Sequence, residues 1–126
     1  MNERYIRQTM IPEIGEAGQE KLKNAKVLIV GIGGLGSPIS IYLTAAGVGQ
    51  IGLIDDDIVS KSNLQRQILY TETEIGQSKV ECACRRLSAL NSSTRFETYP
   101  NRFTSDNADR LVSAYDIIID KSYLSY

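Results

Sequence analysis

The stretch that decides the fold reads Lys26-Val27-Leu28-Ile29-Val30-Gly31-Ile32-Gly33-Gly34-Leu35-Gly36. Its first half is a continuous apolar run rich in β-branched residues, which is typical of a strand buried on both faces of a parallel sheet. Glycines end that run, and residues 37–46 then carry apolar side chains at helical spacing, namely Ile39, Leu43 and Ala46. The stretch therefore predicts a strand, a glycine-rich turn and a helix.

The rest of the chain repeats this alternation. Further strands are expected at 51–54, 95–99 and 116–120. A helix is expected over 76–90, buried through Val80, Cys84, Leu87 and Leu90, and another over 106–114, buried through Ala108, Leu111 and Val112. Alternating strands and helices predict a parallel sheet with right-handed crossovers. We expect a short arm and helix over residues 1–25, then a Rossmann-like domain over 26–126 that is truncated after about four strands.

Composition excludes several classes of function. Fourteen basic and fifteen acidic residues leave a net charge of −1, which argues against a nucleic-acid-binding surface. No apolar run is long enough to cross a membrane and the amino terminus does not resemble a signal peptide, so the cytoplasm is the expected location. The absence of histidine removes imidazole metal sites and Ser-His or Cys-His pairs. Cys82 and Cys84 would point to opposite sides of one helix, so neither a disulfide nor shared metal binding is expected.

The glycine turn and a later acid together indicate a nucleotide site. Glycines allow a phosphate to approach the backbone, and the helix that follows offers free amide groups and a favourable dipole. Asp55 comes directly after the next strand, where a doubly wound fold places an acid for the ribose hydroxyls. A tight structural turn is the alternative reading of the glycines alone.

The loop after Asp55 favours a polyphosphate over a dinucleotide. It reads Ser62-Asn63-Leu64-Gln65-Arg66-Gln67, at the edge of the sheet where ligands bind. Arg66 could hold phosphate oxygens with two hydrogen bonds, and Lys79 could neutralise phosphate charge. Either residue alone would be read as a solvated surface charge. In combination with the glycine turn they predict a polyphosphate site.

Several motifs in this order resemble the ThiF/MoeB/HesA family, the bacterial relatives of ubiquitin-activating enzymes. They are Arg4-Tyr5-x-Arg7-Gln8, the strand and glycine turn, Ala46-Gly47-Val48-Gly49, Asp55-x-Asp57, the block 62–67, and Gly76-x-x-Lys79. The likeness runs from about residue 4 to residue 120. The segments 67–70 and 73–76 look more like ThiF, the thiamine-pathway member, than MoeB.

The resemblance implies ATP-dependent adenylation of the C-terminal glycine of a ubiquitin-like sulfur-carrier protein in thiamine or molybdopterin biosynthesis. ATP would be bound, with Mg²⁺, by Gly31, Gly33, Gly34, Gly36, Asp55, Asp57, Ser62, Asn63, Gln65, Arg66 and Lys79. Arg7, Arg66 and Lys79 would act as the catalytic cations. The resemblance also implies a homodimer in which Arg7 reaches the partner's ATP site.

The chain departs from the family after Asp120. Where the family continues Cys-Thr-Asp-Asn, this sequence reads Lys121-Ser122-Tyr123-Leu124, so Tyr123 replaces the metal-binding aspartate. The family's paired Cys-x-x-Cys zinc motifs and its sulfur-accepting cysteine are also absent from the sequence. We therefore expect an N-terminal fragment that is weakly active or inactive on its own.

Two alternatives remain open from the sequence. An NAD-binding oxidoreductase domain would explain the glycine turn and Asp55, but it would leave residues 62–67 and Lys79 without a purpose. A degenerate family member that docks a partner without chemistry would explain the missing metal-binding aspartate.

Overall fold

The computed structural model describes residues 15–33, 36–60 and 71–120 of the chain. Its α-helices are α2 (Gly15–Asn24), α3 (Gly36–Ala46), α4 (Lys79–Leu90) and α5 (Ser105–Ala114). A 3₁₀ turn, η3 (Glu72–Glu74), precedes α4. Its strands are β1 (Lys26–Val30), β2 (Gln50–Ile54), β3 (Arg95–Tyr99) and β4 (Ile117–Asp120). These elements confirm the alternation that the sequence predicts.

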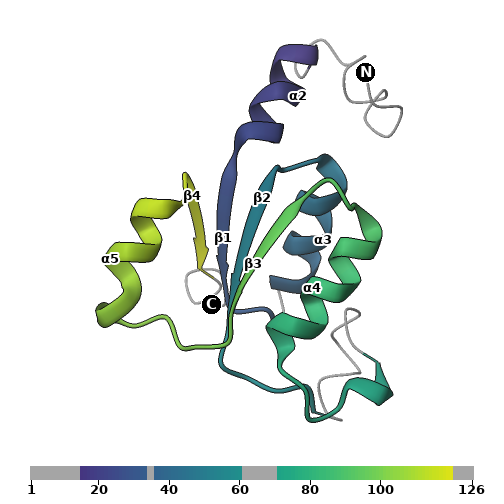
Figure 1. Ribbon diagram of the computed structural model, residues 1–126, viewed down its shortest axis with the longest axis vertical. Coiled ribbons are helices and arrows are strands. Elements are labelled where there is room, and N and C mark those ends of the chain that lie inside the picture. The colour runs from purple at the N-terminus through teal and green to yellow at the C-terminus, as the bar shows by residue number, and fades with distance from the viewer. Residues whose placement is uncertain (1–14, 34–35, 61–70, 121–126) are drawn as a thin grey trace.

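The four strands form one parallel sheet in the order β3-β2-β1-β4 (Figure 1). β1 is central, and its register sets Val30 opposite Ile54 on one side and opposite Asp120 on the other. All three strand pairs are parallel, so the carboxyl ends of the strands lie at one edge of the sheet. The predicted Rossmann-like α/β fold is confirmed.

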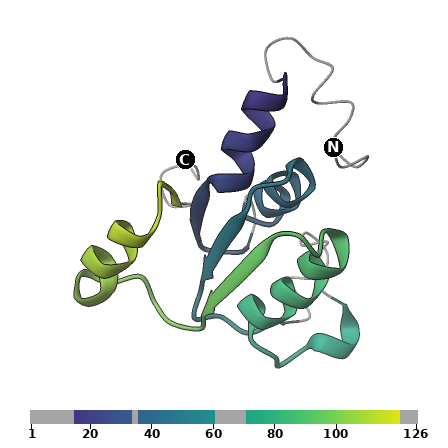
Figure 2. The same cartoon turned by 45° about the horizontal axis from the view of Figure 1, so that its top comes forward.

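Helices cover both faces of the sheet. α3 and α4 lie on one side and α5 on the other (Figures 1 and 2). Alternate residues of β1 enter the two cores, as expected of a strand buried on both faces. Val27 and Ile29 pack toward α4, against Val80, Ala83 and Leu87. Leu28 packs with Ile54, Leu111 and Tyr115 on the α5 side.

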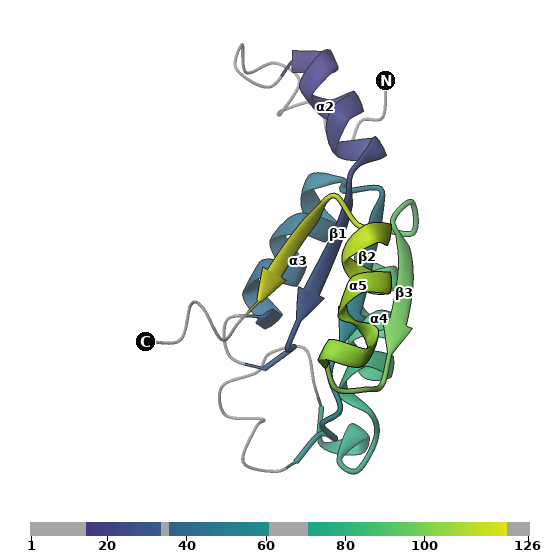
Figure 3. The ribbon, with the colours of Figure 1, turned by 90° about the vertical axis from the view of Figure 1, so that its left-hand side faces the viewer.

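The helix α2 extends from the amino edge of the sheet, away from the carboxyl ends of the strands (Figures 1 and 3). The Gly49 N–H donates to the Leu22 carbonyl at 3.0 Å, and a Cβ at Gly49 would collide with the Lys23 carbonyl. The glycine is therefore required for the close approach of two backbones. This explains one glycine of the 46–49 motif as a packing feature rather than a ligand site.

Two of the predicted helix faces need correction. In α4, Cys84 is only half-buried and Leu90 is exposed, whereas Cys82 and Ala83 are buried. The predicted face and the observed face both contain Val80 and Leu87, so helical spacing is compatible with either. Packing on the sheet buries the face that contains Ala83. In α5, Leu111 is buried but Val112 is 47% exposed. Adjacent helical residues point about 100° apart, so contact through Leu111 turns Val112 outward.

The start of α4 also differs from the prediction. Residues 76–78 do not join the helix but lie beside residues 57–59, with Ile58 and Ser78 forming an antiparallel bridge. Within residues 15–33, 36–60 and 71–120, no helix has the length and apolar character needed to cross a membrane.

Candidate functional site

The glycine turn lies at the carboxyl edge of the central strand. The Gly31 N–H donates to the Ile54 carbonyl at 2.9 Å, so the turn is attached to the end of β2. Gly31 has φ of 87°, a conformation that side chains other than glycine rarely adopt. Gly33 is buried, and Gly36 begins α3. The strand before the turn and the helix after it are therefore confirmed, and phosphate binding at this turn stays a prediction.

Asp55 joins this turn to the loop after β2. Its Oδ2 accepts the Ile32 N–H at 2.8 Å, and its Oδ1 accepts the Asp57 N–H at 2.8 Å. The Asp55 N–H in turn donates to the Tyr99 carbonyl at the end of β3. A carboxylate can accept about four hydrogen bonds, so both oxygens keep capacity for ligand hydroxyls. Asp55 is thus a structural link as well as the predicted ribose ligand.

Residues 57–59 and 76–79 form a clamp at the base of the loop between β2 and α4. The Val59 N–H donates to Gln77 O at 2.9 Å, and the Gly76 N–H donates to Val59 O at 2.8 Å. The Lys79 N–H donates to Asp57 O at 3.1 Å. Gly76 has φ of 90°, which accounts for glycine at that position. The clamp brings Lys79 beside the acid-bearing loop.

The Lys79 side chain is only 4% exposed, although the sequence alone would suggest a solvated charge. Its Nζ lies 3.5 Å from Oδ2 of Asp57, whose own side chain is 66% exposed. A buried ammonium is costly unless it is paired, and Asp57 supplies an opposite charge. The predicted phosphate-side lysine is therefore already ion-paired at the carboxyl edge.

Three consecutive aspartates, Asp55 to Asp57, bring carboxylate oxygens within 4.8 Å of one another. In the described part of the chain, no other three His, Cys, Asp or Glu side chains come together in this way. Each carboxylate has a protein partner. Asp55 accepts two backbone amides, Asp57 pairs with Lys79, and Asp56 pairs with Arg102 at 3.5 Å, where both side chains are exposed. The run is therefore a bonded turn, and its acids are explained without a metal ion.

Sequence reasoning missed an anchor between η3 and α4. Glu74 accepts the Thr71 N–H at 2.9 Å and pairs with Arg85 at 3.3 Å and Arg86 at 3.7 Å. Burial alone would raise the pKa of Glu74, but hydrogen bonds from Thr71, Cys82 and Arg85 outweigh it and hold the pKa below 4.5. The pattern Thr71-x-x-Glu74 is a capping-box signature and could have revealed this anchor.

Cys82 lies in the same cluster, with its Sγ 3.3 Å from Nη2 of Arg85. The side chain is fully buried, and burial together with Glu74 raises the pKa of its thiol above 9.0. A thiol in that state is a poor nucleophile. This geometry agrees with a structural reading of Cys82.

The structure brings together Gly31, Gly33, Asp55, Asp57 and Lys79 at one edge of the sheet, with Gly36 at the start of α3. The remaining predicted site residues lie outside the described residues, so their placement stays a prediction. These are Arg7, Gly34, Ser62, Asn63, Gln65 and Arg66.

The sheet order, the glycine turn and the acid at the end of β2 define a Rossmann-like α/β protein with its ligand edge at the carboxyl ends of the strands. A family model described as the ThiF family matches residues 5–122. The chain belongs to the ThiF family.

Curated relatives agree with this membership. The chain is 49% identical over 120 residues to a sulfur carrier protein adenylyltransferase of Thermus thermophilus, covering 95% of this chain and 44% of the relative. It is 50% identical over 117 residues to an adenylyltransferase and sulfurtransferase of Culex quinquefasciatus, covering 93% of this chain and 27% of the relative. The chain thus spans less than half the length of either relative.

Solved structures show the same fold. The E. coli tRNA N6-threonylcarbamoyladenosine dehydratase in complex with ATP superposes with a TM-score of 0.87 at 31% identity, covering 94% of this chain and 48% of that one. E. coli MccB with MccA superposes with a TM-score of 0.74 at 38% identity, covering 79% of this chain and 30% of that one.

Proposed function

We propose that this domain binds ATP and adenylates the C-terminal glycine of a ubiquitin-like sulfur-carrier protein. The observation that supports this most strongly is the buried Lys79 ammonium paired with Asp57, whose N–H donates to Asp55, the acid that contacts the glycine turn. A dinucleotide site does not need a buried cation after the second strand. The names of the curated relatives, and a solved relative in complex with ATP, support the same activity.

In the proposed reaction the carrier's terminal carboxylate oxygen attacks the α-phosphorus of ATP. The bond from that phosphorus to the β-bridging oxygen breaks, and pyrophosphate leaves with the electron pair. This step needs no side-chain nucleophile, so positioning and cationic stabilisation provide most of the acceleration. The absence of histidine and the buried, poorly nucleophilic Cys82 are compatible with such chemistry.

The predicted site residues have the following roles in this proposal. The backbone at Gly31 and Gly33 admits the phosphates, Asp55 accepts the ribose hydroxyls, and Lys79 neutralises phosphate charge. Arg66 and Asn63, with Ser62 and Gln65 beside them, would complete the phosphate side. Mg²⁺ would arrive on the nucleotide and lower the charge of its phosphates. Asp57 would support the pocket beside Lys79.

The assembly and the pathway are further parts of the proposal. We propose a homodimer in which Arg7 of each protomer contributes to its partner's ATP site. The carrier belongs to thiamine or molybdopterin biosynthesis. Pyrophosphate exchange by the purified chain, measured with the sulfur carrier of each pathway in turn, distinguishes the two pathways. Because Tyr123 replaces the family's metal-binding aspartate, we expect a low adenylation rate.

Carrier-dependent exchange of labelled pyrophosphate into ATP tests the activity. We expect slow exchange that requires the carrier's C-terminal glycine and disappears in Lys79→Met. Replacing Tyr123 by aspartate should raise the rate if the missing acid limits it. Exchange that proceeds equally without the carrier, or that survives in Lys79→Met, would contradict the proposal.

A further inference from the structure

The position of Lys79 is unfavourable for a lysine that has only a structural role. Its side chain is 4% exposed, so the ammonium has lost most of its hydration. Lys79 is also the first residue of α4, where the helix dipole is positive and disfavours a cation. Both costs would fall if an anionic ligand lay beside the ammonium.

Asp57 offsets part of this cost in the absence of a ligand. Its carboxylate lies 3.5 Å from Nζ of Lys79, at the amino end of α4, where a negative charge is favoured. The backbone reinforces the pairing, since the Lys79 N–H donates to Asp57 O at 3.1 Å. Asp57 therefore contacts Lys79 through both its side chain and its main chain.

Asp57 is itself fixed to the glycine turn. Its N–H donates to Oδ1 of Asp55, and Oδ2 of the same carboxylate accepts the Ile32 N–H. The contacts thus run without a break from Ile32 through Asp55 and Asp57 to Lys79. The ammonium is placed relative to the glycine turn by described residues alone.

From these contacts we propose that Asp57 is a positioning residue that holds the Lys79 ammonium in place for the phosphates of ATP. The proposal rests on the proposed function, because it concerns the same nucleotide site. An ammonium has three donors, so pairing with Asp57 leaves donors for phosphate oxygens. Asp57 acts through Lys79 and need not touch the nucleotide.

A double-mutant cycle on ATP affinity tests this directly. The variants are Asp57→Asn, Lys79→Met and their combination, measured by isothermal titration at one fixed, moderate Mg²⁺ concentration. We expect Asp57→Asn to weaken ATP binding about tenfold and Lys79→Met about a hundredfold. The combination should bind no more weakly than Lys79→Met alone, because Asp57 then has no lysine to position.

Asp56→Asn is the matched control. Asp56 neighbours Asp57 and carries the same charge, but it pairs with the exposed Arg102 instead of Lys79. Its replacement should change ATP affinity less than about twofold, since an exposed ion pair contributes little. Equal losses in Asp56→Asn and Asp57→Asn would reduce the effect to net charge and overturn the proposal.

Thermal unfolding without nucleotide separates this proposal from the function on which it rests. Asp57→Asn should lower Tm, whereas Lys79→Met, which removes the buried charge, should leave Tm unchanged or raised. Asp57→Asn in the Lys79→Met background should have no further effect. If the wild-type chain fails to bind ATP, the proposed function fails even where this Tm pattern holds.

Two other results would overturn the positioning role while leaving ATP binding intact. In the first, Asp57→Asn weakens ATP binding equally in the presence and absence of Lys79. In the second, raising the Mg²⁺ concentration restores the ATP affinity of Asp57→Asn, which would mean that Asp57 acts on the cation. Non-additivity together with no rescue by Mg²⁺ supports the role through Lys79.

Discussion

Oδ2 of Asp55 accepts the backbone N–H of Ile32 at 2.8 Å, which ties the end of β2 to the turn after β1. The second oxygen of the same carboxylate accepts the Asp57 N–H at the same distance. The acid that the sequence indicates as a ribose ligand thus also shapes the turn in the absence of any ligand. Loss of Asp55 should affect the turn as well as nucleotide affinity.

Asp55→Asn tests this double role. An asparagine oxygen can accept one of the two amides, but its NH₂ group would face the other. We expect a loss of about 2 kcal/mol in the free energy of unfolding, since hydrogen bonds to charged groups are among the stronger ones. Urea denaturation measures that loss, and amide hydrogen exchange should become faster at Ile32 or Asp57. Unchanged exchange at both amides would show that the carboxylate does not hold the turn.

Gly49→Ala should destabilise the chain by roughly 3 kcal/mol, because the added Cβ meets the Lys23 backbone, which cannot rotate away. Gly76→Ala is the comparison, since it has open space around the added Cβ but a φ of 90°. Backbone strain alone should cost about 1 kcal/mol there. Urea denaturation of the two variants measures the difference. A Gly49→Ala variant as stable as Gly76→Ala would contradict the close packing of α2.

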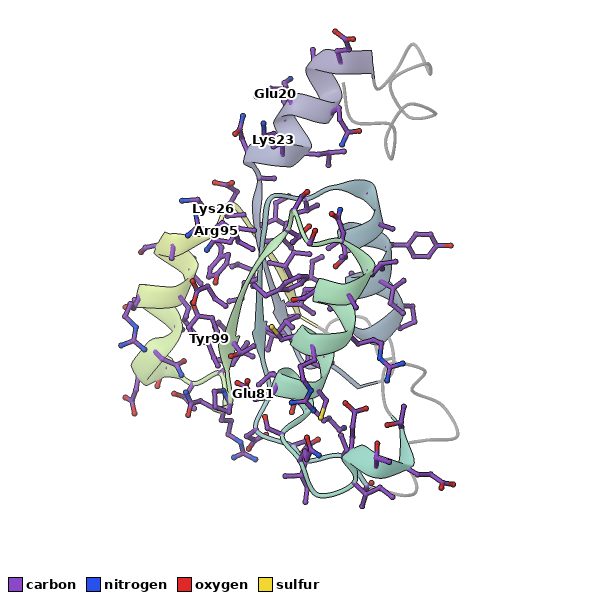
Figure 4. The ribbon with its side chains drawn as sticks, turned by 45° about the vertical axis from the view of Figure 1, so that its right-hand side comes forward. Glu20, Lys23, Lys26, Glu81, Arg95 and Tyr99 are labelled. Atoms are coloured by element: carbon purple, nitrogen blue, oxygen red, sulfur yellow. The ribbon has the colours of Figure 1, made fainter. Side chains whose placement is uncertain are left out.

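Tyr115 lies over Gly52, and its hydroxyl lies 2.9 Å from that of Tyr99. Tyr99 is the last residue of β3 (Figure 4). Burial is the main cause that raises the pKa of Tyr115 well above 10.0, and the hydrogen bond to Tyr99 and the nearby Glu97 carboxylate act in the same direction. Above pH 10.0 the unfolded chain releases a proton that the folded chain keeps, so the free energy of unfolding falls as the pH rises.

Tyr115→Phe should therefore cost about 1 kcal/mol at neutral pH and weaken the alkaline loss of stability. Urea denaturation between pH 8 and pH 11, run beside Tyr99→Phe, measures both effects. If Tyr115→Phe and the wild type lost stability in parallel above pH 10.0, the raised pKa would be wrong.

Glu74→Gln should destabilise the chain by roughly 1 kcal/mol at neutral pH, because it removes the charge that Arg85 and Arg86 face. The folded-state pKa of Glu74 lies below 4.5, so its contribution is complete above that pH and is lost as the pH falls through the folded value. The stabilities of wild type and variant should converge in acid. Glu72→Gln, an exposed neighbour, should show neither effect.

The fold was predictable because each strand is marked by a local run of apolar residues. The run Val27 to Val30 is apolar on both faces, and both faces are covered in the structure. Glycines and Asp55 then had to lie at one edge, since parallel strands end together. That part of the site follows from chain order alone.

The burial of Lys79 could not be predicted from the sequence pattern. Lys79 is in helical phase with Ala83 and Leu87, but charged residues in that phase usually lie at the rim of a core. The clamp between residues 57–59 and 76–79 places Lys79 beside Asp57, and that clamp depends on contacts distant in sequence. The buried face of α4 was misassigned for a related reason, because Cys82 and Cys84 are equally apolar.

Thermal-shift titration with ATP and with NAD tests the central claim most directly. A ligand that binds only the folded state raises Tm by mass action. We predict that ATP with Mg²⁺ raises Tm of the wild-type chain, that Lys79→Met abolishes this rise, and that NAD has no effect at equal concentration. A rise with NAD and none with ATP would contradict the assignment of this edge of the sheet to ATP.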